Sequence, residues 1–200
     1  MSSYSSVYQQ FEHTLAWHCA PSLTGIKPAD LICWEPPHTG AGELLGHYTK
    51  LLAGCGVQLH ILRSCGSRLL ILVFRPAQLE QCLSQQDVRG TLAREGYPVE
   101  TPLDVGALLT HLCCRLEQKE FPHEIGLFLG YPVADVEGFR MHGGRNCKLS
   151  GCWKVYGDAD YARHMFKQFL RCRQTLTRRL EGGLRLDQIL TPIQAYNERI

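Results

Sequence analysis

The feature that most constrains the fold is a pair of apolar segments separated by one short turn. Val57–Arg63 and Arg68–Arg75 have the length and composition of strands, and Ser64–Ser67 between them contains a glycine. Such a turn joins antiparallel neighbours. The second segment includes Leu69–Phe74, the longest apolar run in the chain, which suits a buried strand and is too short to span a bilayer. We therefore expect a β-hairpin within a small sheet.

Most of the remaining chain has the period of amphipathic helices. Apolar residues recur at spacings of three and four over Tyr4–Trp17, Gly42–Ala53 and Pro102–Glu120. Further helices are expected at Leu79–Gly96, in two turns of Phe121–Gly138 broken at Gly130, from Asp158 to about Glu181 and around Leu186–Leu190, and further strands at Asp30–Trp34 and Cys152–Tyr156. The sequence therefore predicts a mixed α/β fold, with a central sheet of about four strands surrounded by helices. Without an evident linker, residues 1–200 are expected to form one domain.

Composition narrows the class of protein. A formal net charge of +2 is too small to indicate a nucleic-acid partner, and neither a signal peptide nor a membrane-spanning run is evident. We therefore expect a cytoplasmic protein that does not enter a membrane. In a reducing compartment its ten cysteines are expected to be thiols, metal ligands or redox groups. The basic residues of the last long helix, including Arg173, are interpreted as a solvated face.

The first candidate motif is His18-Cys19, where the first helix is expected to end. A neighbouring histidine favours the thiolate, which makes the cysteine a nucleophile or a metal ligand. Packing is the alternative interpretation, because free cysteine is among the most buried residue types. Adjacent residues at a helix end also point in different directions, so His18 need not touch Cys19.

The second motif is Phe121-Pro122-His123-Glu124, which opens an apolar segment. His123 suits a general base oriented by Glu124 or another carboxylate, or a metal or heme ligand. The alternative is a histidine that caps a turn. The zinc-protease pattern H-E-x-x-H is excluded, because its second histidine is missing.

The third motif is a glycine-rich loop that contains His142, Cys147 and Cys152. Such a loop could fold around zinc or iron, although the second Cys-x2-Cys pair of common zinc sites is absent. Alternatively, the two cysteines form a redox couple, or one is packed beside Trp153. The same loop carries candidate residues for binding a phosphate-bearing cofactor: Arg145, Lys148, Lys154 and Trp153.

Three segments together carry a resemblance to a known family: His18–Ala29, Phe121–Pro132 and Gly151–Asp158. Over most of its length the chain resembles an uncharacterised bacterial family, a domain of unknown function found mainly in anaerobic Gram-positive bacteria. The resemblance implies no activity. It implies an anaerobic, cytoplasmic setting in which thiols, ferrous iron and flavin or iron–sulfur electron transfer are expected.

Three hypotheses follow, and they leave open whether the protein is an enzyme. The leading one is a metal- or heme-associated redox accessory protein of anaerobic metabolism, served by iron, zinc or heme and by a redox partner such as a flavodoxin. Its main residues are Cys19, His123 and Cys152, with Cys147 and His142 as secondary ligands. The second is a cysteine-dependent enzyme with Cys19 as nucleophile and His123 as base. The third is a non-enzymatic module that binds a phosphate-bearing ligand or a protein.

Overall fold

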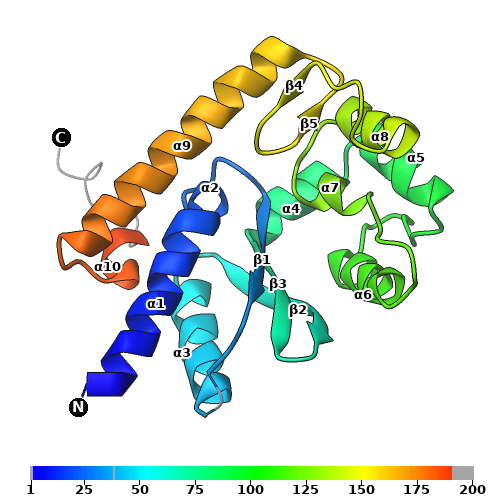
Figure 1. Ribbon diagram of the computed structural model, residues 1–200. Coiled ribbons are helices and arrows are strands. Elements are labelled where there is room, and N and C mark those ends of the chain that lie inside the picture. Colours follow the sequence, from blue (N-terminus) through cyan, green and yellow to red (C-terminus); the bar gives the residue numbers. More distant parts are fainter. Residues whose placement is uncertain (1, 38, 191–200) are drawn as a thin grey trace, which may run out of the picture.

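The computed structural model describes residues 2–37 and 39–190. Its central sheet is antiparallel and contains β1 (Ala29–Trp34), β2 (Gln58–Cys65) and β3 (Arg68–Phe74) in the order β1–β3–β2 (Figure 1). The predicted hairpin is confirmed as β2 and β3. Its second strand, β3, is central because it pairs with β1 on one edge and β2 on the other. Both faces of β3 are also covered, which explains its continuous apolar run.

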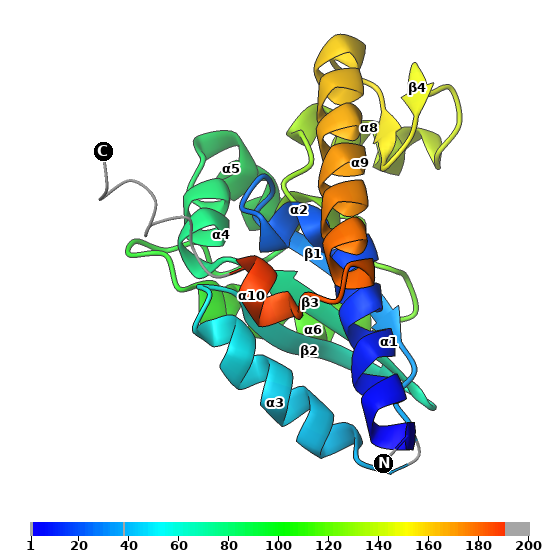
Figure 2. The same ribbon diagram turned by 90° about the vertical axis from the view of Figure 1, so that its left-hand side faces the viewer.

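Helices cover both faces of this sheet (Figures 1 and 2). One side holds α1 (Ser2–His18), α2 (Ala20–Leu23), α3 (Ala41–Ala53), α9 (Ala159–Glu181) and α10 (Leu186–Leu190). The other holds α4 (Pro76–Leu83), α5 (Gln86–Arg94), α6 (Val105–Leu116), α7 (Ile125–Phe128) and α8 (Val133–His142). Alternation along β3 supplies both cores: Ile71 and Val73 pack on the first side, Leu72 and Phe74 on the second. The predicted α/β class is confirmed.

Local sequence signals explain several element boundaries. Asp104 and Asp158 accept hydrogen bonds from backbone N–H groups in the first turns of α6 and α9 and therefore act as N-caps. The predicted break between two helical turns is confirmed at Gly130, which has a φ of +74°. A Cβ there would lie 2.7 Å from the Pro28 ring, so this turn requires glycine.

The strand predicted at Cys152–Tyr156 does not join the central sheet. It contributes β5 (Lys154–Val155), which pairs with β4 (Leu149–Ser150) in a separate two-stranded sheet. This β4–β5 hairpin packs on α9 through a small cluster that includes Trp153, Val155 and Phe169. The strands are thus divided between sheets of three and two. Within the described residues, no helix is long and apolar enough to cross a membrane.

Candidate functional site

A pocket of about 350 Å³ lies where α7 and α8 meet the β4–β5 hairpin. Most of its walls are aromatic or aliphatic, formed by Phe121, Ile125, Leu129, Tyr131, Val136, Phe139 and Trp153. His123, Cys152 and Lys154 also line this aromatic pocket. Concave, mainly apolar sites with a few polar groups are typical of small-molecule binding. The structure thereby brings together four residues predicted from three different roles: His123, Cys152, Trp153 and Lys154.

Two stacked rings form the inner wall of the aromatic pocket. The rings of Tyr131 and Trp153 lie 4.9 Å apart between centroids, with an interplanar angle of 25°. The buried carboxylate of Asp135 fixes the indole, because Trp153 Nε1 donates to Asp135 Oδ2 at 2.7 Å. Its other oxygen accepts from the backbone N–H groups of Tyr156 and Gly157, each at 2.7 Å. Asp135 therefore joins the first turn of α8 to the β4–β5 hairpin and holds one wall of the pocket rigid.

His123 lies at the mouth of the aromatic pocket. Its exposed ring packs in a T-shaped arrangement with the Phe139 ring, with centroids 4.9 Å apart, and its centroid lies 6.1 Å from that of the Phe121 ring. In the part of the chain that the structure describes, no hydrogen bond orients this imidazole and no carboxylate pairs with it. The ring is therefore open to a ligand.

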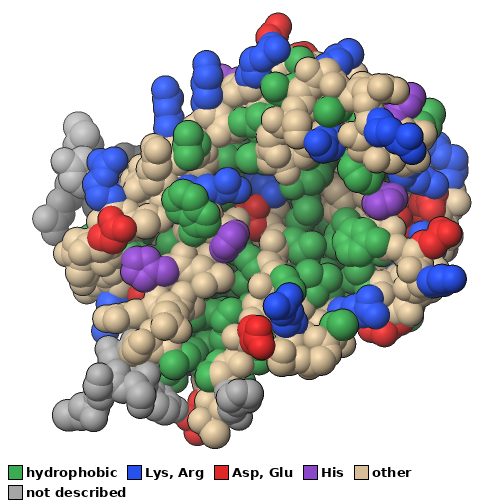
Figure 3. Space-filling model, viewed as in Figure 1, with side chains coloured by type: hydrophobic (Ala, Val, Ile, Leu, Met, Phe, Trp, Pro, Cys, Tyr) green, Lys and Arg blue, Asp and Glu red, His purple; other side chains and the backbone are tan. Residues whose placement is uncertain are grey.

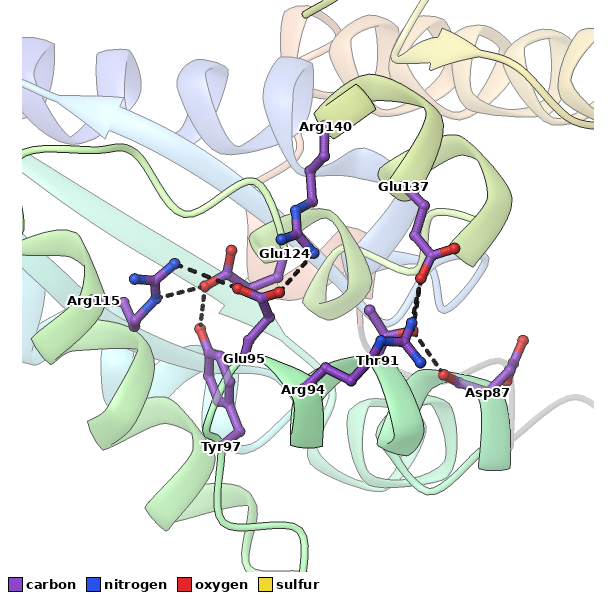
Figure 4. Close-up of polar contacts among 9 residues, drawn as sticks. All are labelled: Asp87, Thr91, Arg94, Glu95, Tyr97, Arg115, Glu124, Glu137 and Arg140. Atoms are coloured by element: carbon purple, nitrogen blue, oxygen red, sulfur yellow. Dashed lines mark hydrogen bonds and ion pairs between the residues drawn. The ribbon is translucent and has the colours of Figure 1, made fainter. Parts of the chain in front are cut away.

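Glu124 points away from the aromatic pocket and does not orient His123. It is buried, and its Oε1 accepts from Arg115 Nε at 2.9 Å and from the Tyr97 hydroxyl at 3.2 Å (Figure 4). Burial raises the pKa of Glu124, but the hydrogen bonds that its carboxylate accepts from Arg115, a backbone N–H and Tyr97, together with the charge of Arg115, outweigh burial and lower the pKa from its ordinary value. Glu124 is thus not placed to orient His123 in this structure, because its carboxylate is engaged by Arg115 and Tyr97.

Glu124 belongs to a chain of ion pairs that links four helices (Figure 4). Arg115 on α6 also approaches Glu95, which follows α5, at 3.7 Å. Arg140 on α8 pairs with the other oxygen of Glu95 at 2.7 Å. We call Tyr97, Glu95, Arg115, Glu124 and Arg140 the Glu124 network. Its polar groups are mutually paired, which indicates a structural role.

Cys19 is fully buried, with 0% of its surface exposed, in the core beside α1 and α9. Burial, and secondly the charge of Asp30, raises the pKa of the thiol well above its ordinary value. No hydrogen bond joins Cys19 to His123 among the described residues. These surroundings favour packing over nucleophilic attack, which requires an accessible thiolate.

The three predicted metal ligands are not gathered. His142 is exposed and stacks on Tyr156, with ring centroids 5.5 Å apart, whereas Cys152 lines the aromatic pocket. Cys147 is half-buried in the intervening loop. Over residues 2–37 and 39–190, no group of three or more His, Cys, Asp or Glu side chains is arranged to hold a metal ion.

The glycine-rich loop that is predicted to bind a phosphate forms hydrogen bonds within itself. The backbone N–H groups of Arg145, Lys148 and Gly151 all donate to carbonyls within this region. The ammonium of Lys148 donates to the Gly157 carbonyl at 2.8 Å, and that of Lys154 donates to Ser150 Oγ at 2.9 Å. These three amides are already hydrogen-bonded and are not free to bind an anion, which counts against a phosphate cradle in this loop.

A second cavity of about 310 Å³ adjoins the aromatic pocket, and we call it the cationic cavity. It is lined by His18, Lys27, Asp30, Leu31, Leu129, Tyr131, Gly151, Cys152, Phe169 and Arg173. Arg173 is half-buried there, so its interpretation as part of a solvated helix face is wrong. α9 packs against α1 and α2, and Arg173 lies on the part of α9 that borders the cavity.

Comparison with protein-family models gives one match, to a family described as a protein of unknown function (DUF3793), over residues 15–190. The chain belongs to this family. Both cavities lie entirely within the matched range. Curated proteins and solved structures give no match. Because the family description carries no activity, function has to be argued from the site itself.

Sequence reasoning missed the residues that define the cationic cavity, above all Lys27. The sequence contains a signal for Lys27 at the end of His18–Ala29, one of the segments that carry the family resemblance. Lys27 and Asp30 are three residues apart, and they flank the start of a strand that is otherwise apolar. A lysine and an aspartate at the entry to a buried strand indicate a buried ion pair, which is found here at 2.7 Å.

Proposed function

We propose that this protein is a binding module for a small ligand with a flat apolar ring, which the aromatic pocket accommodates. The observation that carries the proposal is the aromatic wall made by Trp153 and Tyr131, which Asp135 fixes in place. Rigid aromatic surfaces bind planar rings with little loss of conformational entropy. The volume of about 350 Å³ falls in the range of small-molecule sites.

The polar groups of the pocket would orient such a ligand. His123 lies at the mouth and Lys154 on the hairpin, on different elements of the pocket wall. Cys152 and His123 line the same space, but no hydrogen bond joins them in the described structure. A nucleophile and its base lie within hydrogen-bond reach in most activated pairs. Binding therefore accounts for the arrangement better than cysteine catalysis.

The test uses phenylnaphthylamine, an uncharged fluorescent probe with flat rings, titrated into the full chain. Phe121 lines the pocket and is 52% exposed, so Phe121→Ala removes one wall with little effect on the core. We expect the dissociation constant to rise about tenfold, the equivalent of about 1.4 kcal/mol of lost apolar and ring contact.

The matched control is Met141→Ala, which removes an apolar side chain that is 74% exposed and does not line the pocket. The affinity of Met141→Ala for the probe should equal that of the wild type. A probe that binds all three proteins equally would show non-specific adsorption and overturn the proposal, as would the absence of binding to the wild type.

The open imidazole of His123 favours a second candidate function, heme binding within the leading redox hypothesis. A histidine at the edge of an apolar pocket is a usual axial ligand. Titration with hemin should then give a Soret band that His123→Ala abolishes and Met141→Ala retains. A spectrum of free hemin throughout the titration would rule this function out.

A further inference from the structure

The cationic cavity contains a buried lysine that is incompletely paired. Lys27 is 7% exposed, and its Nζ donates to Asp30 Oδ1 at 2.7 Å. Its ammonium also lies 5.0 Å from the Tyr131 ring centroid and 5.7 Å from that of Phe169. An ammonium has three N–H donors. Within the described chain, Asp30 is the only hydrogen-bond acceptor that Nζ reaches, so two donors have no protein acceptor.

A second cation in this cavity has an unused donor. Arg173 Nε is shielded from solvent and makes no hydrogen bond in the described part of the structure. Arg173 comes from α9, whereas Lys27 precedes β1 and His18 ends α1. Three different elements therefore direct basic side chains to one space.

The charges of this cavity do not balance. Lys27 and Arg173 carry two positive charges, and Asp30 supplies one negative charge. The second oxygen of Asp30 is also engaged, because it accepts from the backbone N–H of Ser22 at 2.9 Å. Burial lowers the pKa of Lys27, but Asp30 reverses this effect and the pKa is raised, so the ammonium stays charged at neutral pH. Asp30 offsets one of the two positive charges, and the shielded Nε of Arg173 has no acceptor in the described structure, which favours an anion in this cavity.

The cationic cavity and the aromatic pocket share part of their walls. Leu129, Tyr131, Gly151 and Cys152 line both. The space-filling view shows Lys, Arg, His and acidic side chains gathered beside a band of hydrophobic side chains in the middle of one face (Figure 3). One ligand of modest size could therefore reach both environments.

We propose that the cationic cavity binds the anionic group of the ligand whose ring occupies the aromatic pocket, with Arg173 and Lys27 as the anion contacts. The ligand class is a planar aromatic compound that carries a carboxylate or a phosphate. This inference rests on the proposed function, because it assumes a ring in the aromatic pocket. It adds a charge requirement that ring binding alone does not have.

The experiment compares three probes with the same ring by calorimetric titration: naphthyl phosphate, naphthoate and uncharged naphthalenemethanol. At least one anion should bind the wild type about tenfold more tightly than the alcohol, as expected for hydrogen bonds to a charged group. The tighter anion identifies phosphate or carboxylate as the preferred chemistry. Arg173→Gln should remove most of this preference and leave the affinity for the alcohol within about twofold.

Matched variants separate charge from folding. Arg171→Gln, on the same helix but exposed and outside the cavity, should keep the preference of the wild type. Arg173→Lys retains the positive charge and should keep part of the preference for the anionic probe. The double variant K27M/D30N removes the buried pair as a unit and should weaken anion binding without leaving an isolated carboxylate.

The outcomes distinguish this inference from the proposed function. If the three probes bind the wild type equally, the anion site is overturned and the ring pocket stands. If an anion is preferred but Arg173→Gln and K27M/D30N both retain the preference, the cationic cavity is not the anion site. If none of the probes binds, the aromatic pocket itself is overturned, and the anion site falls with it.

Discussion

Two regions of this protein gather buried or half-buried charges, and they differ in how completely those charges are paired. In the Glu124 network, Glu124 accepts from Arg115 and Tyr97, and Glu95 pairs with Arg115 and Arg140. In the cationic cavity, Lys27 has one acceptor and the buried Nε of Arg173 has none among the described residues. The charged groups of the network pair with one another, whereas N–H donors of Lys27 and Arg173 in the cavity have no acceptor in the described structure.

This contrast distinguishes a structural residue from a candidate binding residue even where the two are adjacent in the sequence. His123 and Glu124 are adjacent and belong to one motif, yet the histidine lines the aromatic pocket and the carboxylate holds helices together. Complete pairing indicates a role in stability, and incomplete pairing beside a cavity indicates a ligand. Variants of single residues can distinguish side chains that stabilise the fold from side chains that bind a ligand.

The largest expected effect is on the Glu124 network. Glu124→Ala should lower the free energy of unfolding by about 3 kcal/mol, because it leaves Arg115 and Tyr97 without their buried partner. Urea denaturation measures the loss. Glu117→Ala removes an exposed carboxylate 3.6 Å from Arg63 and should cost less than about 0.5 kcal/mol. Equal losses in the two variants would contradict the structural role of the network.

The next effect concerns the carboxylate that fixes the pocket wall. Asp135→Asn should cost about 2 kcal/mol, because an amide has one acceptor oxygen where three N–H groups need two. It should also weaken the binding of phenylnaphthylamine, since Trp153 is no longer held. Asp160→Asn, an exposed change at the start of α9, serves as the control and should leave binding intact. Unchanged binding in Asp135→Asn would show that the wall does not need this anchor.

The pH dependence of the free energy of unfolding should reveal the contribution of the ionised Glu124 carboxylate. Its folded-state pKa is lowered, so its contribution is fully present above its ordinary pKa and is lost as the pH falls through the folded value. The difference in unfolding free energy between the wild type and Glu124→Ala should therefore narrow from neutral pH towards about pH 3. A difference that stays constant over this range would mean that the carboxylate charge contributes nothing.

The smallest effect on stability is expected in the cationic cavity. Arg173→Leu should change the free energy of unfolding by less than about 0.5 kcal/mol, because the buried Nε makes no hydrogen bond in the described structure that could be lost. Chemical denaturation of this variant beside Glu124→Ala compares the two regions directly. A loss as large as that of Glu124→Ala would place Arg173 among the residues that hold the fold.

The sequence predicts those parts of the fold that depend on local signals. The hairpin follows from two apolar segments around a glycine turn, and α9 follows from its period and its Asp158 cap. The site depends instead on residues distant in sequence, since Lys27, Cys152 and Arg173 meet only when α9 packs against α1 and α2. Four of the ten residues predicted for the site line the aromatic pocket: His123, Cys152, Trp153 and Lys154. Glu124 and Cys19 are instead buried in the interior of the fold. Periodicity reports which face is apolar, but not which charge lacks a partner.

A crystal structure of the protein with naphthyl phosphate would show whether one ligand occupies the aromatic pocket and the cationic cavity together. We expect the ring against Trp153 and Tyr131, with a phosphate oxygen within hydrogen-bond distance of Arg173 Nε and Lys27 Nζ. A ring bound elsewhere, or a phosphate directed into solvent while Arg173 Nε keeps its donor unused, would contradict it.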